Sequence, residues 1–289
     1  MSGRWLVLRV KSPSDELTPL LAEGLVASGG SAVLEEGDTL TTFVSVDEDG
    51  RRALVTRVGE TLAAIAGTRL DVAAEWQAHE DWTERWREGL APRRISDRLI
   101  VSPSWCAPDA SPGEVLIVID PEMAFGTGEH ATTRGALRLL ERALVPGATV
   151  LDMGTGSGIL AIAAVLLGAT HVDAPELDAD SLPYARANAD RHGVGDRIAF
   201  EHTTVDAAYL LERIERYDVV TANVLSGVLL PLLPGMRGAT RSGGSVIVGG
   251  ILAEESATMI DAAHVAGLSL EAEDREDAWW TGWFRGPIS

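Results

Sequence analysis

The chain has 289 residues, long enough for two domains, and 46% of them are hydrophobic, which suffices for buried cores. Its single cysteine, Cys106, excludes an intrachain disulfide, and because its histidines are scattered we expect no metal site. The net charge of −19 argues against binding to nucleic-acid backbones and suits a basic partner, although solubility explains the same charge equally well.

No apolar run is long enough to span a membrane, and the N-terminal residues do not form a signal peptide. We therefore expect a cytoplasmic protein with no membrane contact. We also expect it to be a monomer.

The first 76 residues alternate between strand-like and helix-like patterns. Strands are predicted at 4–10, 31–36, 39–46 and 70–76, and helices at 12–30 and 51–67. In the first helix, Ser12 is expected to be the cap and Pro13 the first helical residue. The order βαββαβ is typical of a small ferredoxin-like α+β domain. Nothing in it resembles a catalytic site, so substrate docking and a purely structural role both stay open.

Residues 77–95 are predicted to link this domain to a second one through a helix. Trp82 and Trp86 lie four residues apart, on one face of such a helix, and Pro92 ends it. Tryptophan pairs at this spacing pack between domains more often than they bind ligands. The predicted domains are therefore 1–76 and 96–289.

The second domain begins with a strand pair, 98–105 and 114–120, and continues from Thr149 with strictly alternating strands and helices. Its further strands are predicted at 149–154, 171–177, 197–202, 217–224, 245–251, 268–274 and 278–284. Helices are predicted at 158–169, 179–193, 228–243 and 254–267. Such alternation predicts an α/β fold with a doubly wound, seven-stranded and mainly parallel sheet, whose ligand lies at the carboxyl ends of the strands.

Two glycine-rich stretches follow predicted strands, and the second of them is DMGTGSG. Its glycines are Gly154, Gly156 and Gly158, whereas a dinucleotide-binding loop would need another glycine in place of Ile159. G-x-G-x-G behind an acid is instead the pattern of Rossmann-like methyltransferases that bind S-adenosylmethionine, because glycines let the backbone approach the ligand closely. Asp152 is expected to support this loop or the ligand from behind.

An acid at the end of the next strand is expected to bind the two ribose hydroxyls of that cofactor. Glu176 lies 22 residues after Gly154, and a carboxylate can accept a hydrogen bond from each hydroxyl. Asp178 or Asp180 is predicted to cap the following helix.

The fourth strand of the alternation ends in TANVLSG, which places Asn223 where amine methyltransferases often have N-P-P-[FY]. An amide oxygen there can accept a hydrogen bond from an incoming amine and orient its lone pair. The aromatic residue that would stack on a nucleobase is missing, which argues against a base as substrate. Simple capping by Asn223 is the alternative.

The stretches DPEMAFGTGEHATT, LDMGTGSGILAIAA and ANVL together resemble the ribosomal protein L11 methyltransferase family. The resemblance implies a ferredoxin-like substrate-recognition domain and a class I methyltransferase domain. It also implies methyl transfer from S-adenosylmethionine to lysine ε-amines and an α-amine of a large-subunit ribosomal protein. By position it assigns cofactor contacts to Phe125, Gly126, Thr133, Gly154, Glu176 and Asn223.

The chain departs from the family pattern at Glu122, Glu129, Ala131 and Glu176, and the last of these follows an unusual Pro175. Glu122 and Glu129 bear more on the substrate than on the chemistry, whereas the longer side chain of Glu176 can still reach the ribose with a different affinity. Asn223 is the expected catalytic residue, and His130 is a candidate base, with simple packing as its alternative.

Two other functions stay open beside methylation of a ribosomal protein. The first is methylation of another protein lysine or of a small amine. The second is binding of S-adenosylmethionine without catalysis, against which the presence of both the Phe-Gly-Thr-Gly loop and Asn223 argues.

Overall fold

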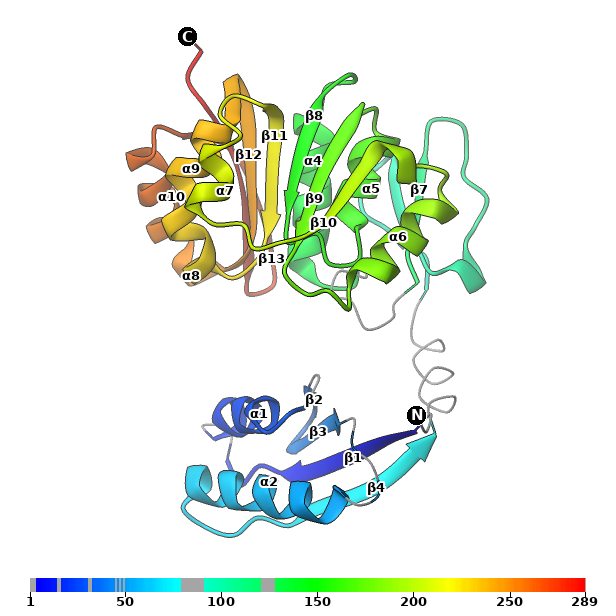
Figure 1. Cartoon of the computed structure of the whole chain (residues 1–289), viewed down its shortest axis with the longest axis vertical. Helices are drawn as coiled ribbons and strands as arrows, with labels where there is room; N and C mark the ends of the chain where they lie inside the picture. Colours follow the sequence, from blue (N-terminus) through cyan, green and yellow to red (C-terminus); the bar gives the residue numbers. More distant parts are fainter. Residues whose placement is uncertain are drawn as a thin grey trace. The chain divides into compact units, whose positions relative to one another are not determined.

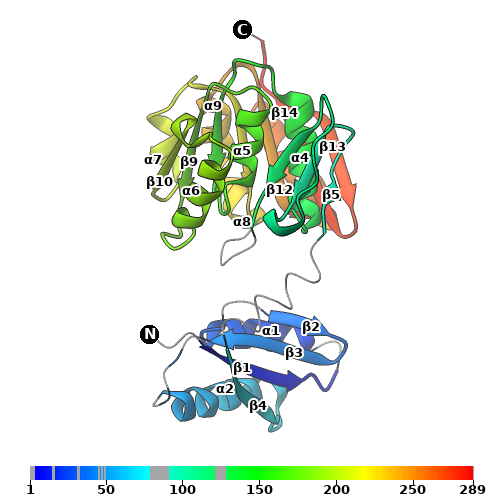
Figure 2. The same cartoon turned by 90° about the vertical axis from the view of Figure 1, so that its right-hand side faces the viewer.

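The computed structural model describes residues 4–14, 17–30, 33–44, 46, 48, 50–78, 91–120 and 128–288 (Figures 1 and 2). Contacts between residues divide the chain into two compact units, Met1–Leu90 and Ala91–Ser289. The predicted connecting helix with Trp82 and Trp86 lies outside the described residues. No helix of the described part is long and apolar enough to cross a membrane.

The first unit is an antiparallel sheet with two helices. Its elements are β1 (Arg4–Lys11), α1 (Thr18–Ala27), β2 (Val33–Glu36), β3 (Thr39–Val44), α2 (Arg51–Ala66) and β4 (Val72–Ala78). The strand order is β2-β3-β1-β4. Alternate residues of β1 face the helices, and their shared core consists of Leu6, Leu8, Val10, Leu21, Leu25, Leu40, Val44, Leu54, Val58 and Leu62. This arrangement confirms the predicted ferredoxin-like fold.

Helix α1 begins six residues later than Ser12, so the prediction of Ser12 as its cap was wrong. The Ser12 N–H donates to the Asp38 carbonyl at 2.7 Å, which ties this residue to the β2–β3 turn instead. The Ser12 hydroxyl donates to the Ser14 carbonyl at 2.8 Å, and the same carbonyl accepts from the Thr18 hydroxyl at 3.2 Å. The chain therefore makes a turn of its own before the helix starts.

The second unit contains a seven-stranded sheet, a three-stranded sheet and helices. The small sheet consists of β5 (Arg93–Arg94), β6 (Leu99–Ser102) and β7 (Val115–Val118), and α4 (Ala131–Ala143) follows it. The large sheet and its helices comprise β8 (Thr149–Met153), α5 (Ile159–Leu166), β9 (His171–Glu176), α6 (Leu182–Arg191), β10 (Ile198–His202), α7 (Ala207–Leu211), β11 (Tyr217–Asn223), α8 (Ser226–Leu229), α9 (Leu233–Ala239), β12 (Thr240–Leu252), α10 (Ser256–Val265), β13 (Ser269–Glu276) and β14 (Trp279–Arg285). Short 3-10 turns are η1 (Ser104–Cys106), η2 (Gly195–Arg197), η3 (Leu230–Leu232) and η4 (Ala253–Glu255).

The strand order of the large sheet is β10-β9-β8-β11-β12-β14-β13, and β14 alone among these strands runs antiparallel to both of its neighbours. The chain winds outward from β8 toward β10 and then returns to β11 on the other side of β8. The topological switch point therefore lies between the carboxyl ends of β8 and β11, where such sheets bind ligands. The predicted fold class is confirmed.

Helices cover both faces of this sheet (Figures 1 and 2). Neighbouring residues of one strand enter different cores, as the period of two requires: Val150 packs with α4 and α5, whereas Leu151 packs with α7, α9 and α10. The central strands are thus packed between two layers of helices, which fixes the positions of their carboxyl ends.

The helix predicted over 228–243 is divided in the structure. It comprises α8, η3 and α9 and ends at Ala239, and the next residues already belong to β12. Pro231 and Pro234 lie in this stretch, and proline cannot donate the backbone hydrogen bond that a continuous helix needs.

Candidate functional site

The loop DMGTGSG follows β8 and leads into α5. Its glycines have left-handed backbones, with φ of 69° at Gly154, 53° at Gly156 and 83° at Gly158. The N–H groups of Gly154 and Thr155 donate to the Pro175 carbonyl at 3.0 and 3.3 Å. A Cβ at Gly154 would lie 2.9 Å from Cγ1 of Val224. A glycine is therefore required where the loop passes the end of β11.

Glu176 ends β9 and is joined to the glycine loop. Its carboxylate accepts from the N–H of Gly156 at 2.8 Å and from that of Asp178 at 2.9 Å. Pro175 is tolerated just before it because the pairing of β9 with β8 ends at Asp173, so no ladder bond to β8 is lost. The carboxylate thus lies beside the loop, 22 residues after Gly154 in the sequence.

The cap of helix α6 is Ser181, so the prediction of Asp178 or Asp180 as its cap was wrong. The carboxylate of Asp178 accepts from the Asp180 N–H at 3.0 Å and from the Ser181 hydroxyl at 2.8 Å. Asp178 therefore orders the turn before the helix. Its carboxylate binds Asp180 and Ser181, which both precede the first helical residue, Leu182, so it satisfies no N–H group of the helix itself.

Asp152 is buried behind the glycine loop. Its Oδ2 accepts from the Thr155 hydroxyl at 2.7 Å and from the Ala161 N–H at 3.1 Å. Its Oδ1 is buried without a partner in the described part of the chain. Burial raises the pKa of Asp152 to about 7. This carboxyl is placed to support the loop and the start of α5.

The Asp152→Asn substitution is expected to change the pH dependence of stability. The pKa of Asp152 rises from 3.8 unfolded to about 7 folded, so the folded state holds the proton more tightly. The wild-type protein therefore loses free energy of unfolding as the pH rises between these values, by on the order of 2 kcal/mol from about pH 5 to about pH 7. The variant lacks this titration. Urea unfolding at several pH values should show the variant gaining stability relative to wild type as pH rises, and parallel profiles would contradict the assignment.

Thr133 and Asn223 meet at the carboxyl edge of the sheet. Thr133 is fully buried in the first turn of α4, and Asn223 is the last residue of β11. The Asn223 Nδ2 donates to the Thr133 hydroxyl at 3.3 Å. The Oδ1 of Asn223 is buried and has no partner among the described residues. A buried acceptor without a protein partner can accept a hydrogen bond from a bound molecule.

Gly249 is a site residue that the sequence analysis missed. It pairs with Asn223 in the β11–β12 register, and a Cβ at this position would lie 2.8 Å from the Asn223 Oδ1. The next residue, Gly250, has a φ of 79°. A glycine pair inside a strand is a known sign of a bulge or a close approach, so the signal was present in the sequence.

His130 precedes α4 at the same edge. Its Nδ1 lies 2.8 Å from the Thr132 hydroxyl, and its ring contacts the edge of the Trp279 ring with centroids 4.7 Å apart. Burial, followed by the charge of Arg134, lowers the pKa of His130. The neutral imidazole is therefore favoured. Trp279, from the start of β14, was not predicted to contact the site.

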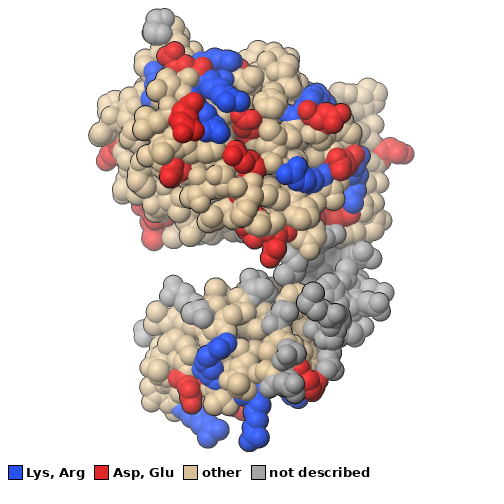
Figure 3. Space-filling view, in the orientation of Figure 1, with Lys and Arg blue, Asp and Glu red and all other residues tan. Residues whose placement is uncertain are grey.

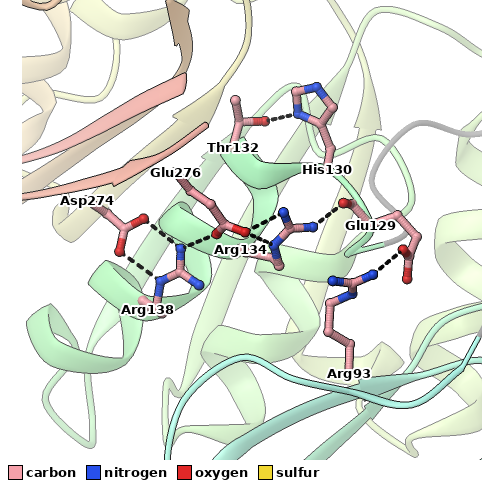
Figure 4. Close-up of polar contacts among 8 residues, drawn as sticks. All are labelled: Arg93, Glu129, His130, Thr132, Arg134, Arg138, Asp274 and Glu276. Atoms are coloured by element: carbon pink, nitrogen blue, oxygen red, sulfur yellow. Dashed lines mark hydrogen bonds and ion pairs between the residues drawn. The ribbon is translucent and has the colours of Figure 1, made fainter. Parts of the chain in front are cut away.

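The loop before α4 is anchored at both of its described ends. Asp120 accepts from the N–H and hydroxyl of Ser104 at 2.7 and 2.9 Å and pairs with Arg191 at 2.6 Å. Glu129 pairs with Arg93 at 2.8 Å (Figure 4). The carboxylate of Glu129 is thus engaged within the unit. Phe125, Gly126 and Glu122 lie outside the described residues.

The described residues fit the parts of S-adenosylmethionine. Glycines let the loop backbone approach a ligand, Glu176 offers a carboxylate beside that loop, and Asn223 offers a buried acceptor on the other side of the switch point. Within the described ranges no group of three acidic, histidine or cysteine side chains could hold a metal ion.

Comparisons with known proteins point to one family of methyltransferases. The family model described as ribosomal protein L11 methyltransferase (PrmA) matches residues 25–285. The ribosomal protein L11 methyltransferase of Pelotomaculum thermopropionicum is 40% identical over 226 residues, which cover 76% of this chain and 72% of that protein. Its counterpart from Geobacter sulfurreducens is 35% identical over 299 residues, covering 96% of this chain and 97% of the relative.

Among solved structures, the ribosomal protein L11 methylase of Lactobacillus delbrueckii subsp. bulgaricus is similar, with a TM-score of 0.60 and 32% identity. The match covers 68% of this chain and 98% of that one. The comparisons confirm the resemblance and, with it, S-adenosylmethionine as the cofactor. The chain belongs to the ribosomal protein L11 methyltransferase family of class I methyltransferases.

Proposed function

We propose that this protein methylates amino groups of ribosomal protein L11, at lysine ε-amines, at the N-terminal α-amine, or at both. The observation that carries the proposal is the Oδ1 of Asn223, a buried acceptor without a described partner at the topological switch point. An amine has the N–H donors that this oxygen requires. The family membership supplies the substrate class.

Bound S-adenosylmethionine supplies a methyl group on a sulfonium, which is already activated for displacement. The protein therefore has to align the amine and exclude water. The Oδ1 of Asn223 accepts one amine N–H and thereby turns the nitrogen lone pair toward the methyl group. Thr133 holds the amide in that orientation, because its hydroxyl accepts from Nδ2.

The amine has to be neutral when it attacks. A lysine amine has a pKa of about 10.4 in water, and transfer into a partly apolar site lowers it. His130 lies at the same edge of the sheet, and its lowered pKa keeps the imidazole neutral and able to accept a proton. We assign it that role, with Trp279 as the apolar neighbour of its ring.

The first unit is assigned to substrate recognition. It carries none of the site residues above, and its ferredoxin-like fold matches what the family resemblance implies. The chain's net charge of −19 favours encounter with a basic protein. On the face shown in Figure 3, basic side chains are interspersed with acidic ones and are not gathered in one patch. This distribution offers little to a nucleic-acid backbone.

The proposal is tested by incubating the purified protein with methyl-labelled S-adenosylmethionine and separated ribosomal proteins. Label on L11, located on lysines or on the N-terminus by mass spectrometry, supports it. Label only on another protein or on a small amine would assign a different substrate. No label in a protein that still binds S-adenosylhomocysteine would make it a binding module and would refute the proposal.

A further inference from the structure

A cluster of partly buried ion pairs joins the start of α4 to the last hairpin of the sheet (Figure 4). Arg134 is only 7% exposed. Its Nε and Nη2 donate to the Oε1 of Glu276 at 2.9 and 2.5 Å, and its Nη1 donates to the Glu129 carbonyl. One guanidinium thus connects β13 with the end of the loop before α4.

The residues that Arg134 holds are those next to the site. The N–H groups of Thr133 and Arg134 both donate to the His130 carbonyl, at 3.1 and 3.2 Å. Residues 129–134 therefore form one tight turn, which the Arg134 side chain closes by returning to the Glu129 carbonyl. His130 and Thr133 lie inside this turn, so its geometry determines where both side chains point.

The hairpin of β13 and β14 contacts residues 129–134 at two points, one on each strand. Glu276 precedes the turn of the hairpin and binds Arg134, whereas Trp279 follows it and contacts the His130 ring. Helix α4 approaches the hairpin closely, because a Cβ on Gly135 would lie 2.6 Å from Oγ1 of Thr281. The hairpin thus supports residues 129–134 through both of its strands.

A second ion pair lies one helical turn further along α4 and offers a natural comparison. Arg138 donates to Asp274 at 2.7 and 2.6 Å and to the Oε2 of Glu276 at 2.6 Å. The Asp274 carboxylate binds Arg138, and the Glu129 carbonyl is held by Arg134 instead. The two carboxylates therefore share a strand, a helix and a kind of partner, and of the two only Glu276 binds Arg134, the residue that holds the Glu129 carbonyl.

We propose that Arg134 and Glu276 are positioning residues for methyl transfer, which hold residues 129–134 so that Thr133 and His130 face the site. Arg134 cannot remain unpaired where it is buried, because an unpartnered charge is costly there. When Glu276 no longer pairs with it, the guanidinium moves and releases the Glu129 carbonyl. The role in methyl transfer rests on the proposed function. The ordering of residues 129–134 by Arg134 and Glu276 does not depend on it.

The test compares Glu276→Gln with Asp274→Asn, which remove one charge each from the same cluster. Hydrogen–deuterium exchange of residues 128–134 is measured in the ligand-free protein, and the Kd for S-adenosylhomocysteine is measured by calorimetry. For Glu276→Gln we expect exchange to be faster by about tenfold and the Kd to rise by about tenfold, because a neutral amide no longer neutralises the charge of Arg134 and weakens its charge-assisted hydrogen bonds. For Asp274→Asn we expect both quantities to change by less than about twofold.

Equal effects of the two variants would show a merely structural cluster, and no effect of Glu276→Gln would show that the loop does not depend on it. Either result overturns the proposal. Arg134→Lys keeps the charge but cannot bind Glu276 and the Glu129 carbonyl together, so it should reproduce the Glu276→Gln pattern even if the latter does not fold. Neither measurement needs the protein substrate, so a failure to methylate L11 would leave this result readable.

Discussion

Replacement of Asn223 by alanine is expected to lower the rate of methyl transfer by about 100-fold, because one preorganised polar contact to the reacting group is lost. The amide is held by Thr133, and its free oxygen can accept a hydrogen bond from the N–H of an amine. Affinity for S-adenosylhomocysteine should fall much less, by no more than about fivefold, because the proposed ribose contact of Glu176 and the glycine loop are untouched. Single-turnover kinetics with L11 and calorimetry with the cofactor product separate the two effects.

Thr221→Val is the matched control for Asn223→Ala. Thr221 lies two residues earlier on the same face of β11, and its hydroxyl is also buried without a described partner. Valine keeps its shape, so the rate should stay within about twofold of wild type. An Asn223→Ala protein that retains the full rate, or a Thr221→Val protein that loses it, would contradict the assignment of the amine contact to Asn223.

The second large effect is expected for Glu176→Ala, which should raise the Kd for S-adenosylhomocysteine about 100-fold. Its carboxylate holds the Gly156 N–H at 2.8 Å and is proposed to accept the ribose hydroxyls as well. Loss of two charge-assisted hydrogen bonds of about 1.5 kcal/mol each corresponds to this factor. Isothermal titration calorimetry of the folded variant measures it directly.

Asp178→Asn is the control for Glu176→Ala. Asp178 lies two residues further along the same turn, but its carboxylate accepts from Asp180 and Ser181. Its replacement should therefore change the Kd by less than about threefold. If Asp178→Asn weakened binding as much as Glu176→Ala, the ribose contact would have to be assigned to the turn as a whole.

Local patterns predicted most of the fold. The alternation of strands and helices after Thr149 was correct for all seven strands of the large sheet, and the βαββαβ order was correct for the first unit. The errors were at element ends and inside one helix: α1 starts at Thr18, and the helix predicted over 228–243 is divided and ends at Ala239. Ends depend on single hydrogen bonds such as that of Ser12 with Asp38, which joins residues distant in the sequence.

Part of the candidate site could also be predicted. The left-handed glycines at 154, 156 and 158 follow from the need for close backbone approach, and Glu176 follows from its spacing to them. Gly249, Trp279 and Glu276 were missed. Each lies on one of the last three strands, and only the pairing of these strands in the sheet brings it to the site. Their contribution depends on the β11–β12 and β12–β14 registers, which local periodicity does not specify.

The sequence by itself determined the family, the two folds, the cofactor class and the identity of the glycine loop, because all of these depend on short-range spacing and on residue types. The tertiary structure alone decided which side chains meet: Asn223 with Thr133, His130 with Trp279, and Arg134 with Glu276. These partners are separated by 90 to 149 residues along the chain, counted from their numbers. They come together because the order of strands in the sheet places the carboxyl end of β11, the start of α4 and the β13–β14 turn at one edge.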